Sequence, residues 1–316
     1  MRKAGVLRRP DGWVVVRVED VAAALTSSKL SVSPPFAASG AAARLQARMA
    51  RFSDDENHSH ARTHLAAVLP EVRGLREASH RRTLALLPTA AATMDAMALA
   101  RTVPVSVLGE ALGIGAGDIT RAVTLTGRLC RALAAGLSTL TSTGAGDRTA
   151  SELLDLLRAT RTRSDGDDIV AAVSVLVQAY DATAAFIGAA VLVHSQRVDA
   201  GIGVETTLER TLRQDAPVQC TRRWATDNVE LGGIIVPAGA VVWIFLAAAE
   251  EGAPKRPSTF GAGPHSCPGS AQATAIARGM LTALVEAGWT AVPGQVVTYE
   301  SRPNLRMPMQ VLVEKR

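Results

Sequence analysis

The middle of the chain carries apolar residues three and four positions apart, which is the spacing of one face of an α-helix. This pattern runs almost without interruption from Ala41 to about Gly201, and segments such as DITRAVTLTGRLCRALAAGL show it clearly. We expect a series of helices here, because the pattern is broken only at proline and glycine positions. The expected breaks are Pro70, Pro88, Pro104, residues 115–117, residues 144–146 and Gly166.

Both ends of the chain show short apolar runs beside turn residues instead. In RRPDGWVVVRVED, residues 10–12 separate two such runs and predict a small hairpin, and VEDVAAALTS predicts a short helix with Asp20 near its start. Residues 217–246 are rich in Val and Ile and predict two short strands around two turns, 232–233 and 237–239. A loop is expected at 250–258, and residues 296–315 predict a terminal hairpin.

These patterns together predict one mainly α domain with small β-sheets, an α+β fold. A chain of 316 residues is long enough for one large domain or two ordinary ones, and the strands at both ends favour a single unit. We expect it to consist of an N-terminal strand and helix segment at 1–40, a helical body at 41–215, a strand region at 216–259, a cysteine loop and helix at 260–290, and a C-terminal hairpin at 291–316.

Composition narrows the function classes. The net charge of +5 comes from Arg residues scattered along the chain, and aromatics are only 3% of the residues, so a nucleic-acid surface is not expected. No run of about 18 apolar residues and no signal-peptide pattern occurs, so we expect neither a membrane span nor export. Cys130, Cys220 and Cys267 are too widely spaced for a disulfide framework, which favours a reducing cytoplasm.

The ten residues FGAGPHSCPG at 260–269 carry the most specific chemistry. They predict a loop that presents the Cys267 thiol just before a helix, where the helix dipole favours a thiolate. Glycines in such a loop allow a close approach that a side chain would block. A flat apolar partner can lie against Phe260, and His265 can reach an anionic group at its edge. The alternative is that Cys267 is a buried structural thiol in a glycine-rich turn.

This loop resembles the haem-binding loop of the cytochrome P450 family. The resemblance implies that haem b is the cofactor and that Cys267 is the axial ligand of its iron. It also implies that the cofactor is held by Phe260, Gly261, Gly263, His265 and Gly269. Cys130 and Cys220 lie in ordinary helical and strand patterns, so we interpret both as packing residues.

Two further segments resemble the family in the same order along the chain. In DDENHSHAR, His58 and Arg62 are four residues apart and share one face of a helix, and the family uses this pair to bind a haem propionate. In CTRRWATDNVELGG, Arg223 matches the family residue that clamps a propionate through a guanidinium–carboxylate pair. The resemblance covers nearly the whole chain and is to a shortened, atypical bacterial member.

The helix expected over the cofactor departs from the family. Asp181 holds the position of the family's acid, but Ala182 stands where the family has the Thr that guides protons to iron-bound oxygen. Thr183 is one residue further and is turned by about 100° around the helix, so it does not simply substitute. The resemblance still implies that these three residues form the distal, catalytic side.

Other departures lie in the supporting structure. The family's Glu–Arg pair beneath the haem is not intact, and Glu209 and Arg213 are the candidates to replace it as an i,i+4 pair. The loop before the cysteine, the stretch between Ser195 and Glu205 and the N-terminal segment are all shorter than in the family.

The resemblance implies an oxidoreductase: a monooxygenase-like tailoring enzyme that acts on a small organic molecule in specialised metabolism. Because Ala182 replaces the Thr, a peroxide-driven or redox-neutral haem-thiolate enzyme is the second hypothesis, and a non-catalytic haem-binding sensor or scaffold is the third. The implied partners are the substrate and a ferredoxin with its reductase, with a homodimer left open. We interpret His58, His60 and His64 as one propionate contact and two exposed histidines rather than a metal cluster.

Overall fold

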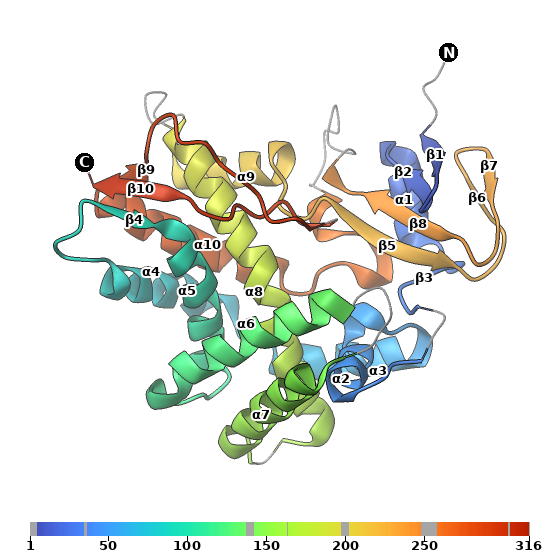
Figure 1. The fold of residues 1–316 in the computed structure, drawn as a ribbon, viewed down its shortest axis with the longest axis horizontal. Coiled ribbons are helices and arrows are strands. Elements are labelled where there is room, and N and C mark those ends of the chain that lie inside the picture. Colours follow the sequence, from blue (N-terminus) through green and yellow to red (C-terminus); the bar gives the residue numbers. More distant parts are fainter. Residues whose placement is uncertain are drawn as a thin grey trace.

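The computed structural model describes residues 5–34, 37–136, 142–162, 164–196, 202–247, 258–302 and 304–315. Ten α-helices lie in these ranges, and they form most of the molecule (Figure 1). Their bounds are α1 Val18–Thr26, α2 Ala41–Ala47, α3 Asp55–Val68, α4 Leu75–Leu86, α5 Ala96–Ala111, α6 Ile119–Gly136, α7 Gly144–Thr160, α8 Gly166–Ser195, α9 Val204–Gln214 and α10 Ser270–Glu286.

Helix α8 is the centre of the helical body and packs against α3, α5, α6, α7, α9 and α10 (Figure 1). Asp165 caps its first turn by accepting hydrogen bonds from the backbone N–H groups of Asp167 and Asp168. The helix is long and apolar enough to cross a membrane, but 72% of its most apolar window is buried inside the protein. A hydrophobic helix with this burial is the core helix of a globular domain.

The strands form three small sheets beside this body (Figure 1). The largest has the order β1-β2-β8-β5-β3, in which only the β2–β8 pair is parallel. The second has the order β4-β10-β9, and β6 and β7 form a separate hairpin. The bounds are β1 Val6–Arg9, β2 Gly12–Val15, β3 Leu30–Ser31, β4 Thr93–Asp95, β5 Cys220–Ala225, β6 Val229–Leu231, β7 Ile234–Val236, β8 Val241–Phe245, β9 Trp289–Ala291 and β10 Leu312–Lys315.

Two hydrophobic cores hold these layers together. The large one lies among the helices and includes Phe186 and Leu176 of α8. The small one lies between the five-stranded sheet and α1, and Val15 and Ile244 are fully buried in it. The end of α1 also contacts the segment before Cys267, so the sheet layer and the helical body meet at the cysteine loop.

The fold class predicted from the sequence is confirmed, and so are the N-terminal hairpin and α1. The expected break at Pro104 is wrong, because this proline lies inside α5. Proline there loses one backbone hydrogen bond, but its ring is buried and the helix continues through it. The expected loop at 250–258 lies outside the described residues except at its last residue.

Two strand predictions were also wrong. Residues 217–246 hold four strands rather than two, because β5 and β8 pair with each other while β6 and β7 form their own hairpin. The tail prediction is wrong only for its last strand: Tyr299 and Pro308 form an antiparallel bridge within the tail, but β10 lies between β4 and β9 and pairs with both. The pairing of β10 with β4 could not be read from a local pattern, because β4 lies more than 200 residues earlier in the chain.

Candidate functional site

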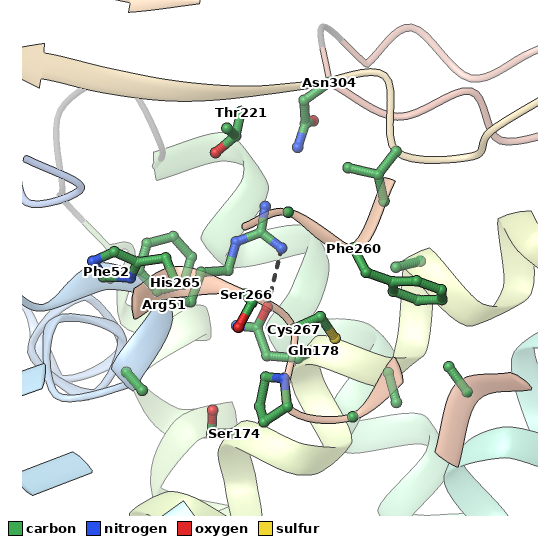
Figure 2. A pocket seen from close by; sticks show the side chains of 18 of the residues that line it. Arg51, Phe52, Ser174, Gln178, Thr221, Phe260, His265, Ser266, Cys267 and Asn304 are labelled. Atoms are coloured by element: carbon green, nitrogen blue, oxygen red, sulfur yellow. Dashed lines mark hydrogen bonds between the residues drawn. The ribbon is translucent and has the colours of Figure 1, made fainter. Parts of the chain in front are cut away.

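The cysteine loop has a fixed backbone conformation. Gly261 and Gly263 have φ values of +70° and +68°, a region that favours glycine. The Cys267 N–H donates to the Phe260 carbonyl at 2.8 Å, and the Ser266 N–H donates to the Gly263 carbonyl at 3.1 Å. These bonds close the loop just before α10 begins and turn the Cys267 side chain toward a cavity (Figure 2).

This cavity has a volume of about 810 Å³ and lies between the cysteine loop and α8. Its size falls within the range of small-molecule and cofactor pockets. Phe260, β5 and β8 contribute further walls. The side of the cavity formed by α8 is lined by Ser174, Val175, Gln178, Ala179, Ala182, Thr183 and Phe186.

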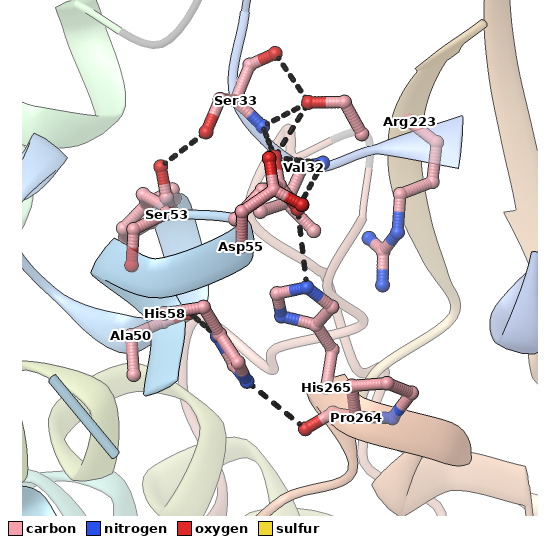
Figure 3. Close-up of polar contacts among 12 residues, drawn as sticks. Val32, Ser33, Ala50, Ser53, Asp55, His58, Arg223, Pro264 and His265 are labelled. Carbon is pink, nitrogen blue, oxygen red and sulfur yellow. Dashed lines mark hydrogen bonds and ion pairs between the residues drawn. The ribbon is translucent and has the colours of Figure 1, made fainter. Parts of the chain in front are cut away.

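Basic side chains line one edge of the cavity. Arg62 on α3 donates to the Ser266 carbonyl at 3.1 Å, and so links that helix to the cysteine loop. The rings of His58 and His265 pack with their centroids 4.1 Å apart. The two ring nitrogens of His58 lie 2.8 Å from the Ala50 carbonyl and 3.2 Å from the Pro264 carbonyl (Figure 3). His58 therefore holds the loop to α3, and at most one of its nitrogens donates in the neutral ring.

Asp54 holds the His265 side of this edge through several hydrogen bonds. It accepts hydrogen bonds from the Ser31 hydroxyl at 2.6 Å, from the backbone N–H groups of Val32 and Ser33, and from His265 Nε2 at 3.3 Å. Burial would raise the pKa of Asp54, but the bonds from His265, Ser31 and the backbone outweigh it and hold this pKa well below its ordinary value. Asp54 is therefore a fixed anion that orients the His265 ring.

Arg223 on β5 is a buried cation without a carboxylate partner among the described residues. Its side chain is only 6% exposed, and it donates to the Thr221 hydroxyl at 2.7 Å and the Arg222 carbonyl at 3.0 Å. Burial, with a smaller contribution from nearby Arg51, lowers the pKa of Arg223 to about 10. His265 Nδ1 is likewise buried without a hydrogen-bond partner in the described part of the chain. The Arg223 guanidinium and His265 Nδ1 both border the cavity, and each suits an anionic group bound there.

The Cys267 thiol is exposed to the cavity, and it is enclosed by protein on its other sides. Burial raises the pKa of this thiol, whereas a backbone hydrogen bond from Gly269 and the charges of Arg51 and Arg62 lower it. The sequence predicted a helix terminus that favours the thiolate, but within the protein alone burial is the larger effect.

The distal residues predicted from the sequence separate in the structure. Ala182 and Thr183 line the cavity, but Asp181 does not. Its carboxylate accepts a hydrogen bond from Arg302 Nη1 at 2.9 Å, and Arg302 also pairs with Glu300. Burial raises the pKa of Asp181, although the charge of Arg302 opposes this effect. Asp181 therefore ties α8 to the C-terminal segment and does not face the Cys267 thiol.

Most of the predicted cofactor-binding residues are brought together. Gly263 does not line the cavity; a side chain there would contact Leu25 and Thr26 of α1, so this glycine allows a close packing of loop and helix. The residues that do line it are His58, Arg62, Arg223, Phe260, Gly261, His265, Cys267 and Gly269.

The expected Glu209–Arg213 pair does not form: Glu209 is exposed, and neither side chain has an ion-pair partner among the described residues. Thr207 and Thr211 occupy the buried face of α9 instead, and their hydroxyls donate to carbonyls one turn earlier. These hydrogen bonds satisfy the hydroxyls on the buried face of α9 without a buried ion pair.

His60 and His64 are not part of this site. They bond instead to Asp167 and Asp168 at the start of α8, each at 2.9 Å. The His64 and Asp168 pair therefore fastens α3 to α8.

Arg51 is a residue of the site that the sequence did not reveal. It crosses the cavity and donates to Gln178 Oε1 on α8 at 3.2 Å (Figure 2). Burial lowers the pKa of Arg51, an effect that the Cys267 thiol partly offsets. The only available signal was its position seven residues before His58, which does not predict the direction of a side chain.

No protein-family model matches the chain, and no curated protein sequence matches it either. Solved structures do. CalO2 superimposes with a TM-score of 0.83 at 22% identity, over 100% of this chain and 94% of that one. The open cytochrome P450 Eryk from S. erythraea gives 0.80 at 18%, over 99% and 93%. P450BioI, solved with an acyl carrier protein bearing hexadec-9Z-enoic acid, gives 0.79 at 19%, over 96% and 92%.

These identities are too low to carry an activity or a substrate from one protein to another. The agreement in backbone nevertheless extends over 96–100% of this chain. The chain therefore has the cytochrome P450 fold.

Proposed function

We propose that this protein is a haem-thiolate oxidoreductase that acts on a small organic molecule, with haem b as its cofactor and Cys267 as the axial ligand. One observation carries the proposal: a thiol faces a cavity of about 810 Å³ that is bounded by α8 opposite, and at one edge by the buried Arg223 guanidinium and by His265 Nδ1, which has no hydrogen-bond partner among the described residues. A planar dianion with a central metal satisfies all three features at once.

The cationic edge suits the two haem propionates. Arg223 offers a guanidinium without a carboxylate partner among the described residues, and His265 offers a nitrogen without a hydrogen-bond partner there. Arg62 gives a further positive charge. His58 has both nitrogens near carbonyls, so we propose that it positions the cysteine loop and the His265 ring. Phe260 and the small residues on α8 provide apolar contacts for the flat faces.

Thiolate-ligated haem supplies redox chemistry at its iron, including the activation of oxygen or peroxide. The chain itself contributes little acid–base assistance on the α8 side. Ala182 brings no hydroxyl to the cavity, and the Asp181 carboxylate does not line it but is bonded to Arg302, which does. A positioned acid or base typically contributes about 10²–10⁴-fold to a rate, so oxygen cleavage must obtain its protons from Thr183, ordered water or the substrate.

This arrangement favours a second candidate function, a peroxide-driven or redox-neutral haem-thiolate enzyme. The specific observation is the pair of changes at Ala182 and Asp181, which remove the two groups that would deliver protons. Monooxygenation remains our first candidate, because Thr183 still lines the cavity and Ala179 leaves space beside it.

We propose an acidic ferredoxin as the electron donor for the first candidate. A shallow groove on the cysteine side is lined by Arg62, Arg73, Pro268 and Gln272, and Arg76 and Arg81 are exposed nearby on α4. We also propose a cytoplasmic location, since three widely spaced free cysteines suit a reducing compartment. The role in specialised metabolism stays a proposal drawn from the sequence resemblance.

The test is a carbon monoxide difference spectrum of the reduced protein, together with a pyridine haemochrome assay for haem b. The expected result is a Soret band at the thiolate-ligated position, lost in Cys267→Ala and kept in the matched variant Cys130→Ala. Protein that stays colourless after reconstitution with haem refutes the proposal, and so does a thiolate band that survives in Cys267→Ala.

Three conditions separate the two candidates. The first supplies a surrogate ferredoxin with its reductase and NADPH, and the second supplies hydrogen peroxide alone. The third supplies no electron donor and no oxidant, and is kept under argon. Monooxygenation predicts substrate-dependent oxygen uptake only in the first condition, and Ala182→Thr should increase it. Turnover in the second or third condition, with no gain in Ala182→Thr, supports the second candidate.

A further inference from the structure

The cavity over Cys267 is strongly asymmetric in charge. Six arginines line it, and no Asp or Glu is found among its described lining residues. Their positions are Arg51, Arg62, Arg131, Arg222, Arg223 and Arg302. This is more positive charge than the two propionates of a bound haem neutralise, and two of the six, Arg51 and Arg131, are exposed, so the cavity can hold a further anion.

Several of these arginines already have a role. Arg62 and Arg223 lie on the edge that suits the propionates, and Arg302 pairs with Asp181 and Glu300. The Arg222 guanidinium lies over the rings of two tryptophans. Arg51 and Arg131 remain, and the described part of the chain gives neither of them a carboxylate partner.

Arg51 and Arg131 approach the same part of α8. Arg131 lies on α6, where the neighbouring Cys130 thiol donates to the Val177 carbonyl of α8 at 3.5 Å. Gly127, one turn earlier on α6, packs against Tyr180. The two helices therefore cross beside Gln178, which is the residue that Arg51 contacts from the other side of the cavity.

The surrounding wall is mainly apolar. On the α6 and α8 side, apolar lining residues include Ala134, Val175, Ala179 and Phe186, while Ser174, Gln178 and Thr183 are polar. A ligand that matches this wall has an apolar body and a single anionic group. A planar carboxylate fits a guanidinium particularly well, because both of its oxygens can accept hydrogen bonds from one side chain.

We propose that the substrate is a carboxylic acid with an apolar body, and that its carboxylate binds Arg51 and Arg131 beside Gln178. This inference rests on the proposed function, because it places the acid in the same cavity as the haem. Arg51 exchanges its neutral partner, the Gln178 amide, for the carboxylate. The two arginines act as substrate-binding residues that set specificity, and they take no part in bond cleavage.

The test uses ω-imidazolylalkanoic acids of increasing chain length and their matched primary amides. The imidazole anchors each probe on the haem iron, so the chain carries the acid or the amide across the cavity even though the substrate is unidentified. Binding is measured from the shift of the Soret band and by calorimetry. Holoprotein is used for the wild type and for Arg51→Gln, Arg131→Gln and the control Arg128→Gln, an exposed position one turn from Arg131 on α6.

We expect the best acid to bind about 10- to 100-fold more tightly than its amide, the range of a charge-assisted hydrogen bond. Arg51→Gln and Arg131→Gln should each reduce this ratio to about threefold or less, and Arg128→Gln should keep it. Wild-type holoprotein that binds acids and amides equally, or binds neither, overturns the carboxylate site. A preference that survives in both variants overturns the assignment of Arg51 and Arg131.

These results are distinct from a failure of the proposed function. If the wild-type protein lacks the thiolate-ligated carbon monoxide band, the proposed function is refuted, whatever the affinity of the protein for the acids. Each variant is therefore checked for the same band and haem content before titration, so that a lost preference reflects the arginine and not a lost cofactor.

Discussion

The replacement of Arg223 by methionine should stabilise the protein without haem and weaken its hold on haem. The side chain is 6% exposed, and its guanidinium has neutral oxygen acceptors and no carboxylate partner in the described part of the chain. Methionine has a similar length, carries no charge and tolerates irregular packing. Arg223→Met therefore measures two quantities separately: the cost of burying the guanidinium in the protein without haem, and the contribution of that guanidinium to haem binding.

The magnitude follows from the lowered pKa. Burial, together with Arg51, lowers the pKa of Arg223 from its ordinary value to about 10 in the folded protein. At about 1.4 kcal/mol for each pKa unit, this shift corresponds to about 3 kcal/mol of destabilisation. The unfolded chain binds the proton more tightly, so the full cost is present below the folded pKa and fades only as pH rises toward the unfolded value. At neutral pH we expect Arg223→Met to recover about 1–3 kcal/mol.

The opposite sign is expected once haem is bound. Removal of one partner of a buried ion pair typically costs about 3–5 kcal/mol, so haem should dissociate at least about 100-fold more readily from Arg223→Met. The assays are urea unfolding of the protein without haem and the rate of haem transfer to excess apomyoglobin. Arg9→Met is the control, because Arg9 is exposed on β1 of the same sheet.

Two results would refute this reasoning. If Arg223→Met lowers the unfolding free energy of the protein without haem, the guanidinium has a stabilising partner that the geometry does not reveal. If haem transfer is unchanged while the Arg9→Met control behaves as expected, Arg223 does not bind a propionate.

Three further predictions test the surroundings of the site. Asp54→Asn should cost about 2–4 kcal/mol of unfolding free energy at neutral pH, because it removes a buried acceptor of several hydrogen bonds; since the folded pKa is depressed, the difference from wild type should shrink as pH falls below about 4. The hydrogen bond from His64 to Asp168 raises the pKa of His64, so its stabilisation is complete below about pH 6.5 and is lost as pH rises through the folded pKa; thermal unfolding of wild type and His64→Gln should therefore differ in acid and converge in base. Gly279→Ala should lower the unfolding free energy by at least about 2 kcal/mol, because its methyl group would meet a backbone carbonyl of α4, whereas Gly166→Ala meets no atom and should leave stability within about 1 kcal/mol of wild type in urea unfolding.

Helix positions were predictable wherever a local rule decided them. The 3.6-residue repeat located α6, α7 and α8, and the turn at 10–12 located the first hairpin. Pro104 misled the prediction, because α5 continues through this buried proline. The end of the tail misled it for another reason, since β10 pairs with β4, which is far away in the sequence.

The candidate site likewise contains residues that the sequence revealed and residues that it did not. The loop from Phe260 to Gly269 is contiguous, so its glycines and its thiol can be recognised together from the amino-acid order alone. The role of Asp181 could not be recognised in this way, because the partner that turns it away from the cavity, Arg302, lies 121 residues further along the chain. Arg51 and Arg131 lie in separate segments, and neither has a spacing that marks it as part of a site.

The sequence by itself determined the helical body, the conformation of the cysteine loop and the loss of the distal hydroxyl at Ala182. These depend on interactions between residues close together in the chain, for which periodicity and turn chemistry are sufficient. Only the tertiary structure decided which charges remain unpaired inside the cavity. That outcome depends on how the segment around Arg51, α3, α6 and β5 pack beside α8 around one space, and the order of the arginines in the sequence does not contain it.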